Sequence, residues 1–217
     1  MEEIKIQNVS KKIKRNMVLR NISIEINKGE IIGLSGENGS GKTMLMRLII
    51  GLVFPSEGEI IIQGKVLGKD IEFPENVGFL IENPAFLDYC SGFENLKILA
   101  DIRRVVSDEE IYQTLKRVGL ESDNRKKYKK YSLGMKQRLG IACAILEKPD
   151  ILVLDEPTNA LDENGIELLK QIIREEKQRG TTILLSCHDK LFLEEMADRI
   201  YEMHNGRIVY NYGGTTQ

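Results

Sequence analysis

Cysteine, proline and aromatic residues are few in this chain, and tryptophan is absent. The three cysteines, Cys90, Cys143 and Cys187, are far apart and form no CxxC pair, which argues against a zinc cluster or a disulfide framework. The sequence contains no Pro-rich linker, low-complexity tract or internal repeat. We therefore expect one compact unit with reduced cysteines, in which Cys143 is a small core residue.

A strong charge of one sign and long hydrophobic runs are also missing. The net charge is −2 at pH 7, so no global positive field attracts nucleic acid, and the basic runs 11–15 and 125–130 are interpreted as solvated faces. The longest strongly apolar stretch, residues 48–54, is far shorter than the roughly 20 residues that span a bilayer, and the MEEIK start is unlike a signal peptide. We expect a water-soluble, cytoplasmic protein with no nucleic-acid partner and no direct membrane insertion.

Apolar periodicity predicts mainly β-structure in the first half of the chain. Apolar and polar residues alternate around residues 4–6 and 22–26, as they do in half-buried strands. A short apolar run, residues 30–34, ends at a glycine-rich turn, and a segment of helical composition follows from Lys42. Two further strands are expected at residues 59–63 and 77–80.

The second half of the chain predicts helices, followed by strands that alternate with helices. Helical spacing recurs between residues 92 and 147, where Ser132 is a candidate helix cap. The apolar runs ILVLD and TTILLS are separated by a helical pattern, which is typical of a parallel sheet in an α/β protein. The Asn205-Gly206 pair predicts a closing β-hairpin.

The segment GENGSGKT matches the P-loop pattern, with a predicted strand before it and a predicted helix after it. Glycines here let backbone N–H groups converge on phosphate oxygens at a helix N-terminus, and the flanking elements argue against the alternative of a chance glycine-rich turn. We expect Lys42 to reach the β- and γ-phosphates of ATP and Thr43 to help to hold Mg²⁺. The predicted ATP-binding residues of this loop are Gly36, Glu37, Asn38, Gly39, Ser40, Gly41, Lys42 and Thr43.

Two adjacent carboxylates, Asp155 and Glu156, end the predicted strand ILVLD. An isolated acidic pair at this position would more often cap a helix, but with a P-loop upstream a catalytic interpretation is favoured. We expect Asp155 to belong to the Mg²⁺ shell and Glu156 to polarise the water that attacks the γ-phosphate.

The segment YSLGMKQR, residues 131–138, lies shortly before ILVLDEPT. It resembles the signature motif of ABC transporter ATP-binding subunits, usually LSGGQ followed by a polar residue, Gln and Arg, and the whole chain is similar to that family. Positions that match are Ser132, Gly134, Gln137 and Arg138, and those that depart are Tyr131, Leu133 and Met135. The resemblance implies contacts with the γ-phosphate of ATP held by a second copy, made by Ser132, Leu133, Gly134 and Met135. An N-capped amphipathic helix is expected here as well and does not compete.

Two further motifs fit the same family. NALD, residues 159–162, resembles the D-loop, in which Asp162 would couple the two sites of a dimer. His188 follows TTILLS and matches the switch histidine, whose imidazole can hydrogen-bond the γ-phosphate and the attacking water. A histidine after a strand is usually an ordinary surface or core residue, so this assignment depends on the order of the motifs. The residues implied to be catalytic are Lys42, Glu156 and His188.

Two residues depart from the family pattern near the expected nucleotide. Glu82 stands where the family has a glutamine whose side-chain oxygen lies near Mg²⁺ and water; a carboxylate keeps the oxygen and adds charge. Glutamate here resembles the branch that exports lantibiotics, bacitracin and similar antimicrobial peptides. Ile13 stands where an aromatic residue normally stacks on adenine, so we expect apolar contact alone and weak discrimination between ATP and GTP.

The resemblance implies an α/β P-loop NTPase fold with a RecA-like core, an antiparallel β-subdomain and a small inserted helical subdomain. Residues 1–217 would form one ABC ATPase domain, with residues 1–85 and 148–217 as the core and β-subdomain and residues 86–147 as the helical subdomain.

The implied function is ATP hydrolysis that powers transport, with ATP and Mg²⁺ as cofactors and head-to-tail dimerisation driven by ATP. Implied partners are a second ABC ATPase subunit, identical or paralogous, and transmembrane permease subunits, which would place the chain on the inner face of the cell membrane. The Glu82 branch favours export of a peptide, antimicrobial or drug. The alternatives are a soluble ABC ATPase and a regulatory one with little turnover, whereas a small-molecule kinase has no reason to contain YSLGMKQR.

Overall fold

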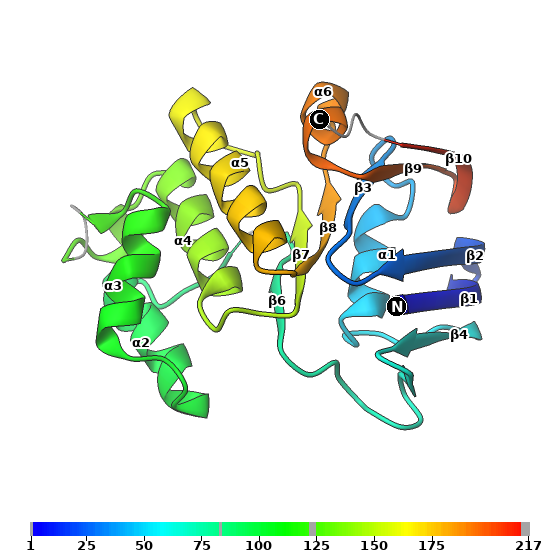
Figure 1. Cartoon of the computed structure of the whole chain (residues 1–217), viewed down its shortest axis with the longest axis horizontal. Coiled ribbons are helices and arrows are strands. Elements are labelled where there is room, and N and C mark those ends of the chain that lie inside the picture. Colours follow the sequence, from blue (N-terminus) through cyan, green and yellow to red (C-terminus); the bar gives the residue numbers. More distant parts are fainter. Residues whose placement is uncertain (1, 83, 122–124, 214–217) are drawn as a thin grey trace.

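Two β-sheets and the helices around them form the fold (Figure 1). The computed structural model describes residues 2–82, 84–121 and 125–213. An antiparallel sheet in the order β2-β1-β4-β5 contains β1 (Glu2–Ile13), β2 (Asn16–Asn27), β4 (Glu57–Ile62) and β5 (Lys65–Val66). A second sheet in the order β10-β9-β3-β8-β7-β6 contains β3 (Ile31–Ser35), β6 (Val77–Leu80), β7 (Ile151–Asp155), β8 (Thr182–Ser186), β9 (Arg199–His204) and β10 (Arg207–Gly213).

In the second sheet, β9, β3, β8, β7 and β6 are parallel and only β10 is antiparallel to its neighbour. The helices are α1 (Lys42–Ile49), α2 (Gly92–Arg103), α3 (Asp108–Arg117), α4 (Leu133–Ile145), α5 (Glu163–Gln178) and α6 (Lys190–Met196), with a short 3-10 helix, η2 (Tyr128–Lys130). The predicted α/β class, the antiparallel sheet and the helical insertion are confirmed. None of the described helices is long and apolar enough to cross a membrane.

The central strands β3, β7 and β8 are buried along their whole length, which explains their nearly continuous apolar sequences. Alternate side chains enter two different cores, because successive residues of a strand point to opposite faces. One core, shared with α4 and α5, receives Ile31, Leu152, Leu154, Ile183 and Leu185. The other, shared with α1 and the antiparallel sheet, receives Ile32, Leu34, Ile151, Val153 and Leu184. In Figure 1, α1 accordingly lies between the two sheets, and α2 to α5 lie on the opposite side of the larger one.

Local capping explains where several helices begin. Ser91 and Ser107 each form a capping box with a glutamate three residues later, and Ser132 caps α4 by accepting a hydrogen bond from the Met135 N–H. The hairpin predicted at Asn205-Gly206 joins β9 to β10, and both turn residues have positive φ. Helices α2, α3 and α4 contact one another, and on this basis we still propose residues 86–147 as a helical subdomain.

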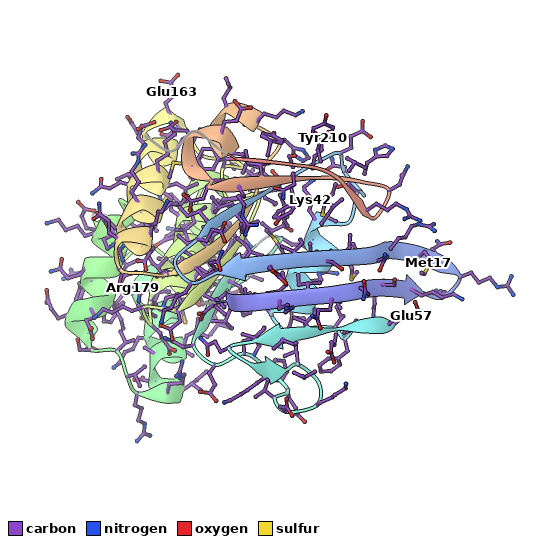
Figure 2. All side chains as sticks on the ribbon, turned by 45° about the vertical axis from the view of Figure 1, so that its right-hand side comes forward. Met17, Lys42, Glu57, Glu163, Arg179 and Tyr210 are labelled. Carbon is purple, nitrogen blue, oxygen red and sulfur yellow. The ribbon has the colours of Figure 1, made fainter. Side chains whose placement is uncertain are left out.

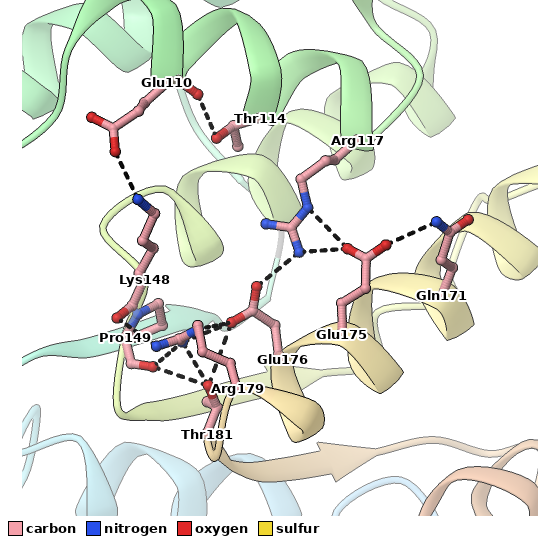
Figure 3. A network of polar contacts seen from close by, with 10 residues as sticks. All are labelled: Glu110, Thr114, Arg117, Lys148, Pro149, Gln171, Glu175, Glu176, Arg179 and Thr181. Carbon is pink, nitrogen blue, oxygen red and sulfur yellow. Dashed lines mark hydrogen bonds and ion pairs between the residues drawn. The ribbon is translucent and has the colours of Figure 1, made fainter.

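Arginine–carboxylate contacts join the helical insertion to α5 (Figure 3). Arg117 of α3 donates to Glu175 at 2.9 Å and to Glu176 at 2.8 Å. Glu176 is 2% exposed, and its second oxygen accepts from Arg179 at 2.7 Å. A buried carboxylate is stable only when it is paired in this way. The insertion is thus tied to α5 by charge as well as by the apolar core.

Close packing of β6 against α4 requires a glycine at position 78. A Cβ atom at Gly78 would lie 1.8 Å from the Ala144 carbonyl oxygen, which is far inside van der Waals contact. We expect Gly78→Ala to lower the free energy of unfolding by about 1–3 kcal/mol or more, because backbone must shift to accept the methyl group. Urea unfolding followed by circular dichroism measures the change. The control is Gly213→Ala, whose Cβ would meet only Asp198 at 3.7 Å; an equal loss in both variants would contradict the packing argument.

Candidate functional site

The carboxyl ends of β3, β7 and β8 meet at one edge of the larger sheet, because these strands are parallel. The P-loop follows β3, Asp155 ends β7 and Ser186 ends β8. A cavity of about 280 Å³ lies at this edge. It is lined by residues 38–44 of the P-loop and first turn of α1, and by Val18, Arg47, Glu82, Asp155 and Glu156.

The P-loop needs glycine where its backbone is left-handed. Gly36 has φ 136° and Gly41 has φ 111°, and a Cβ at Gly36 would lie 2.3 Å from the Met203 carbonyl oxygen. The loop is supported by the β9–β10 hairpin, because the Gly206 N–H donates to the Ser40 carbonyl oxygen at 2.9 Å. In turn, the Gly206 carbonyl oxygen accepts from the N–H of Arg20 in β2 at 2.8 Å. Two strand pairs therefore hold the loop in place.

Lys42 is buried at the start of α1, between the β1–β2 and β9–β10 strand pairs (Figure 2). Its Nζ donates to the carbonyl oxygens of Gly36 at 2.6 Å and Glu37 at 3.3 Å, and it lies 3.9 Å from Oε1 of Glu156. Gly36 and Glu37 therefore contact the lysine rather than line the cavity. The ammonium group is held at the first residue of α1, where the positive end of the helix dipole also attracts an anion.

Asp155 is buried between two hydroxyl groups. Its Oδ2 accepts from Thr43 Oγ1 at 2.6 Å and its Oδ1 accepts from Ser186 Oγ at 2.5 Å. The structure therefore brings the two predicted magnesium ligands Thr43 and Asp155 into direct contact. Ser186 is not among the predicted site residues, although its place at the end of TTILLS, on the strand next to ILVLD, indicates this neighbourhood.

Glu156 and His188 face one another beside the cavity. His188 Nε2 lies 3.2 Å from Glu156 Oε1, and the His188 N–H donates to Oε2 at 3.3 Å. Burial raises the pKa of the Glu156 carboxyl above its ordinary value, although the neighbouring His188 and Lys42 partly oppose the shift. A carboxylate of raised pKa is a better proton acceptor than an exposed one, so the pair is suited to general-base chemistry.

Glu82 lines the cavity and forms an ion pair with Arg47, one helical turn after Thr43 on α1. Arg47 is thus a functional candidate that sequence analysis missed; its i+4 spacing from Thr43 places both on one face of the helix. Ile13 is the last residue of β1 and is 43% exposed. It is not among the described residues that line the cavity, whereas the apolar side chain of Val18 is. The predicted weak discrimination between ATP and GTP stays a prediction.

The four signature residues also lie outside the described lining of this cavity. Ser132 and Leu133 are exposed at the start of α4, and Leu133 is 73% exposed. Asp162 caps α5 by accepting from the Gly165 N–H at 2.9 Å and pairs with Arg138 at 2.7 Å. The Gly165 N–H and the Arg138 guanidinium hold the pKa of Asp162 below its ordinary value.

Comparisons with known proteins find relatives along the chain. A family model described as "ABC transporter" matches residues 19–159. The uncharacterized ABC transporter ATP-binding protein YybJ of Bacillus subtilis is 52% identical, over 94% of this chain and 94% of that protein. The bacitracin transport ATP-binding protein BcrA of Enterococcus faecalis is 40% identical, over 95% of this chain and 68% of that protein. A solved dimer of the ATP-binding cassette MJ0796, in a post-hydrolysis state bound to ADP and Pi, has a TM-score of 0.87 and 25% identity, over 99% of this chain and 100% of that one.

The Arg47–Glu82 pair predicts how charge at the cavity controls nucleotide affinity. Arg47→Met leaves an uncompensated carboxylate beside the phosphates and should weaken ATP binding about 2- to 5-fold, whereas Glu82→Gln should strengthen it, and the double variant should lie near the wild type. Isothermal titration calorimetry with ATP in EDTA measures the affinities without Mg²⁺. Arg103→Met, which removes a surface pair with Glu147, is the control. A double variant as weak as Arg47→Met alone would contradict charge compensation.

Proposed function

Since this chain belongs to the ABC transporter family and is an ATP-binding subunit of the ABC ATPase type, we propose that its cavity binds Mg-ATP and that two copies close around the nucleotide to drive export of a peptide. The observation that carries this proposal is the arrangement of charged groups: Lys42, Asp155 and Glu156 line one cavity, while the signature residues lie outside it. On this proposal each chain supplies half of two composite sites.

The P-loop and Lys42 bind the β- and γ-phosphates. Lys42 Nζ already donates to the carbonyl oxygens of Gly36 and Glu37. A triphosphate offers anionic oxygens in their place, and hydrogen bonds between charged groups are about twice as strong as neutral ones. The glycines keep side chains out of the way of the phosphates, so binding needs little rearrangement of the loop.

Mg²⁺ would be held by oxygen atoms of Thr43, Asp155 and Glu82, the donor type that this ion prefers. Within residues 2–82, 84–121 and 125–213, no group of three or more His, Cys, Asp and Glu side chains is arranged to hold a metal ion. Such a sparse protein ligand set fits an ion that arrives with the nucleotide and takes its other ligands from phosphate and water. When bound, the ion supplies positive charge against the phosphate oxygens.

Glu156 accepts a proton from the attacking water, and His188 orients that water and the γ-phosphate. Burial of the Glu156 carboxylate raises its pKa and therefore its ability to accept the proton. The His188 backbone N–H donates to Oε2 of the carboxylate at 3.3 Å, which helps to fix its direction, and the imidazole Nε2 lies 3.2 Å from Oε1. Loss of the γ-phosphate removes a partner of His188, so the imidazole can report on the state of the nucleotide.

A second copy, identical or paralogous, supplies the signature residues. Ser132 and Leu133 are exposed, and the N-terminus of α4 presents the positive end of its dipole to an incoming γ-phosphate. Gly134 and Met135 complete this surface, and Asp162, at the start of α5, lies on the segment that would couple the two sites. Because neither chain holds a whole site, hydrolysis should depend on protein concentration or on partners that hold two copies together.

Permease subunits bind the apolar groove formed on both sides of Glu82 in the sequence. This groove, with a volume of about 570 Å³, is lined mainly by apolar side chains of residues 79–81 and 84–87 and of α2, including Phe86, Ile98 and Leu99. Exposed apolar patches of this kind are typical of protein–protein contacts. An amphipathic helical segment of the permease fits the groove best, because such a helix buries one apolar face.

Export of a peptide is proposed because Glu82 replaces the usual glutamine and because the relative BcrA is a bacitracin transport protein. The chain would then lie on the inner face of the cell membrane, where its permease holds it. The nucleotide site supplies the driving force by closing and reopening the dimer, and the permease determines which peptide is moved.

The dimer proposal predicts the behaviour of Glu156→Gln. This variant should lose ATP hydrolysis by about 100-fold or more, because the amide cannot accept the proton, and it should accumulate as an ATP-bound dimer. Size-exclusion chromatography with light scattering measures the mass with Mg-ATP and with Mg-ADP. A second variant, Glu156→Gln with Ser132→Arg, should stay monomeric because a bulky cation covers the signature surface. Should Glu156→Gln remain a monomer with Mg-ATP, the composite site is wrong.

The groove proposal predicts which surface change detaches the permease. Ile98→Glu places a charge in the apolar groove and should weaken binding of the permease. When the tagged variant is purified from detergent extracts of its host cell, at least about 10-fold less integral membrane protein should copurify with it than with the wild type. The ATPase activity of the isolated subunit should not change. Tyr210→Glu, a change of an exposed aromatic residue on β10, is the matched control. Equal recovery with Ile98→Glu and the wild type would refute the groove as the docking surface.

A further inference from the structure

Helix α4 carries a buried glutamine that contacts the catalytic segment of its own chain. Gln137 is 7% exposed, and its Nε2 donates to the carbonyl oxygens of Glu156 at 3.3 Å and Pro157 at 3.2 Å. Because both partners are acceptors, only the NH₂ side of the amide can face them. The side chain therefore holds the peptide backbone of the residue whose carboxylate faces the attacking water in the proposed function.

Glu156 has a backbone conformation that needs such support. Its φ is 49°, in the left-handed region, which is unfavourable for a residue with a Cβ atom. Its N–H donates to Ser186 Oγ at 2.9 Å, and its carbonyl oxygen accepts from Gln137. With the peptide groups on both sides fixed, the direction of the Cα–Cβ bond is fixed too. That direction brings the carboxylate to Lys42 and His188.

The start of α4 meets the segment after Glu156 at two more points. Arg138 Nη2 donates to Asp162 Oδ1 at 2.7 Å. Gly134 lies so close to this segment that a Cβ atom there would be 2.7 Å from the carbonyl oxygen of Ala160. One turn of α4 thus contacts the chain from Glu156 to Asp162, and Gln137 is the member of this contact that reaches the proposed catalytic residue itself.

We propose that Gln137 is a positioning residue for ATP hydrolysis, which holds the Glu156 backbone so that its carboxylate stays beside His188 and Lys42. The proposal rests on the proposed function, in which Glu156 polarises the attacking water. Helix α4 would then act on two sites. Ser132 at its N-terminus faces the nucleotide of the partner copy, and Gln137, about one and a half turns later, positions the Glu156 carboxylate of its own chain.

Two substitutions test the role of the amide. Gln137→Met keeps the length of the side chain but loses both hydrogen bonds, and Gln137→Asn keeps the amide but is one methylene too short to reach both carbonyls. We expect the kcat of each to fall about 10- to 100-fold while KM for ATP changes less than about 2-fold, as for a misplaced catalytic group. Gln113→Met is the control and should keep the wild-type kcat, because Gln113 is an exposed glutamine of α3 whose side chain donates to Glu109 on the same helix. Circular dichroism confirms folding.

A second measurement separates positioning from a structural effect on the signature surface. In the Glu156→Gln background, Gln137→Met should leave the ATP concentration for half-maximal dimer formation within about 2-fold, because chemistry is already lost and α4 is intact. Loss of the dimer there would overturn the proposal, as would a folded Gln137→Met or Gln137→Asn variant with wild-type kcat. If Glu156→Gln alone still hydrolyses ATP, the proposed function fails and this inference fails with it. If Glu156→Gln is inactive and dimeric but Gln137→Met is fully active, only the inference fails.

Discussion

The burial of both faces of a parallel sheet is the constraint on which the rest of this structure depends. Strands β3, β7 and β8 send alternate side chains into two apolar cores, so a polar side chain has a stable place only where a strand ends. Because the strands are parallel, those ends share one edge, and the P-loop, Asp155 and Ser186 meet there. The position of the cavity is therefore a consequence of how the core is built.

Charge at this edge is kept stable by partners that a ligand can replace. Lys42 uses carbonyl oxygens of its own loop, Asp155 uses two hydroxyl groups, and Glu82 uses Arg47. Buried polar groups without partners are costly, so a site that must release its ligand needs internal substitutes for it. Exchange of these partners for phosphate oxygens and, on the proposed function, for Mg²⁺ costs less than exposing unpaired charges would, which suits a subunit that binds nucleotide reversibly.

The sequence predicts the helices and strands and most of the site, because hydrophobic periodicity, turn residues and the order of motifs can be read directly along the chain. The helix start at Ser132, the hairpin at Asn205 and the grouping of Thr43 with Asp155 all follow from such signals. The contacts that it does not predict join side chains to distant partners. Arg47 forms an ion pair with Glu82, a carboxylate from another loop. Gln137 donates hydrogen bonds to backbone carbonyl oxygens. Because every residue has a backbone carbonyl, no residue type in the sequence identifies these partners. Val18 lines the cavity, and no motif in the sequence singles it out.

The hydrogen bond from Gly206 to Ser40 joins a loop near the beginning of the chain to a hairpin far later in it. During synthesis on the ribosome, the P-loop emerges long before β9 and β10, and so do β3 and α1 beside it. A nascent chain that still lacks the hairpin therefore lacks one of the supports that hold the P-loop, and the loop gains this support only when the last strands of the larger sheet have been added.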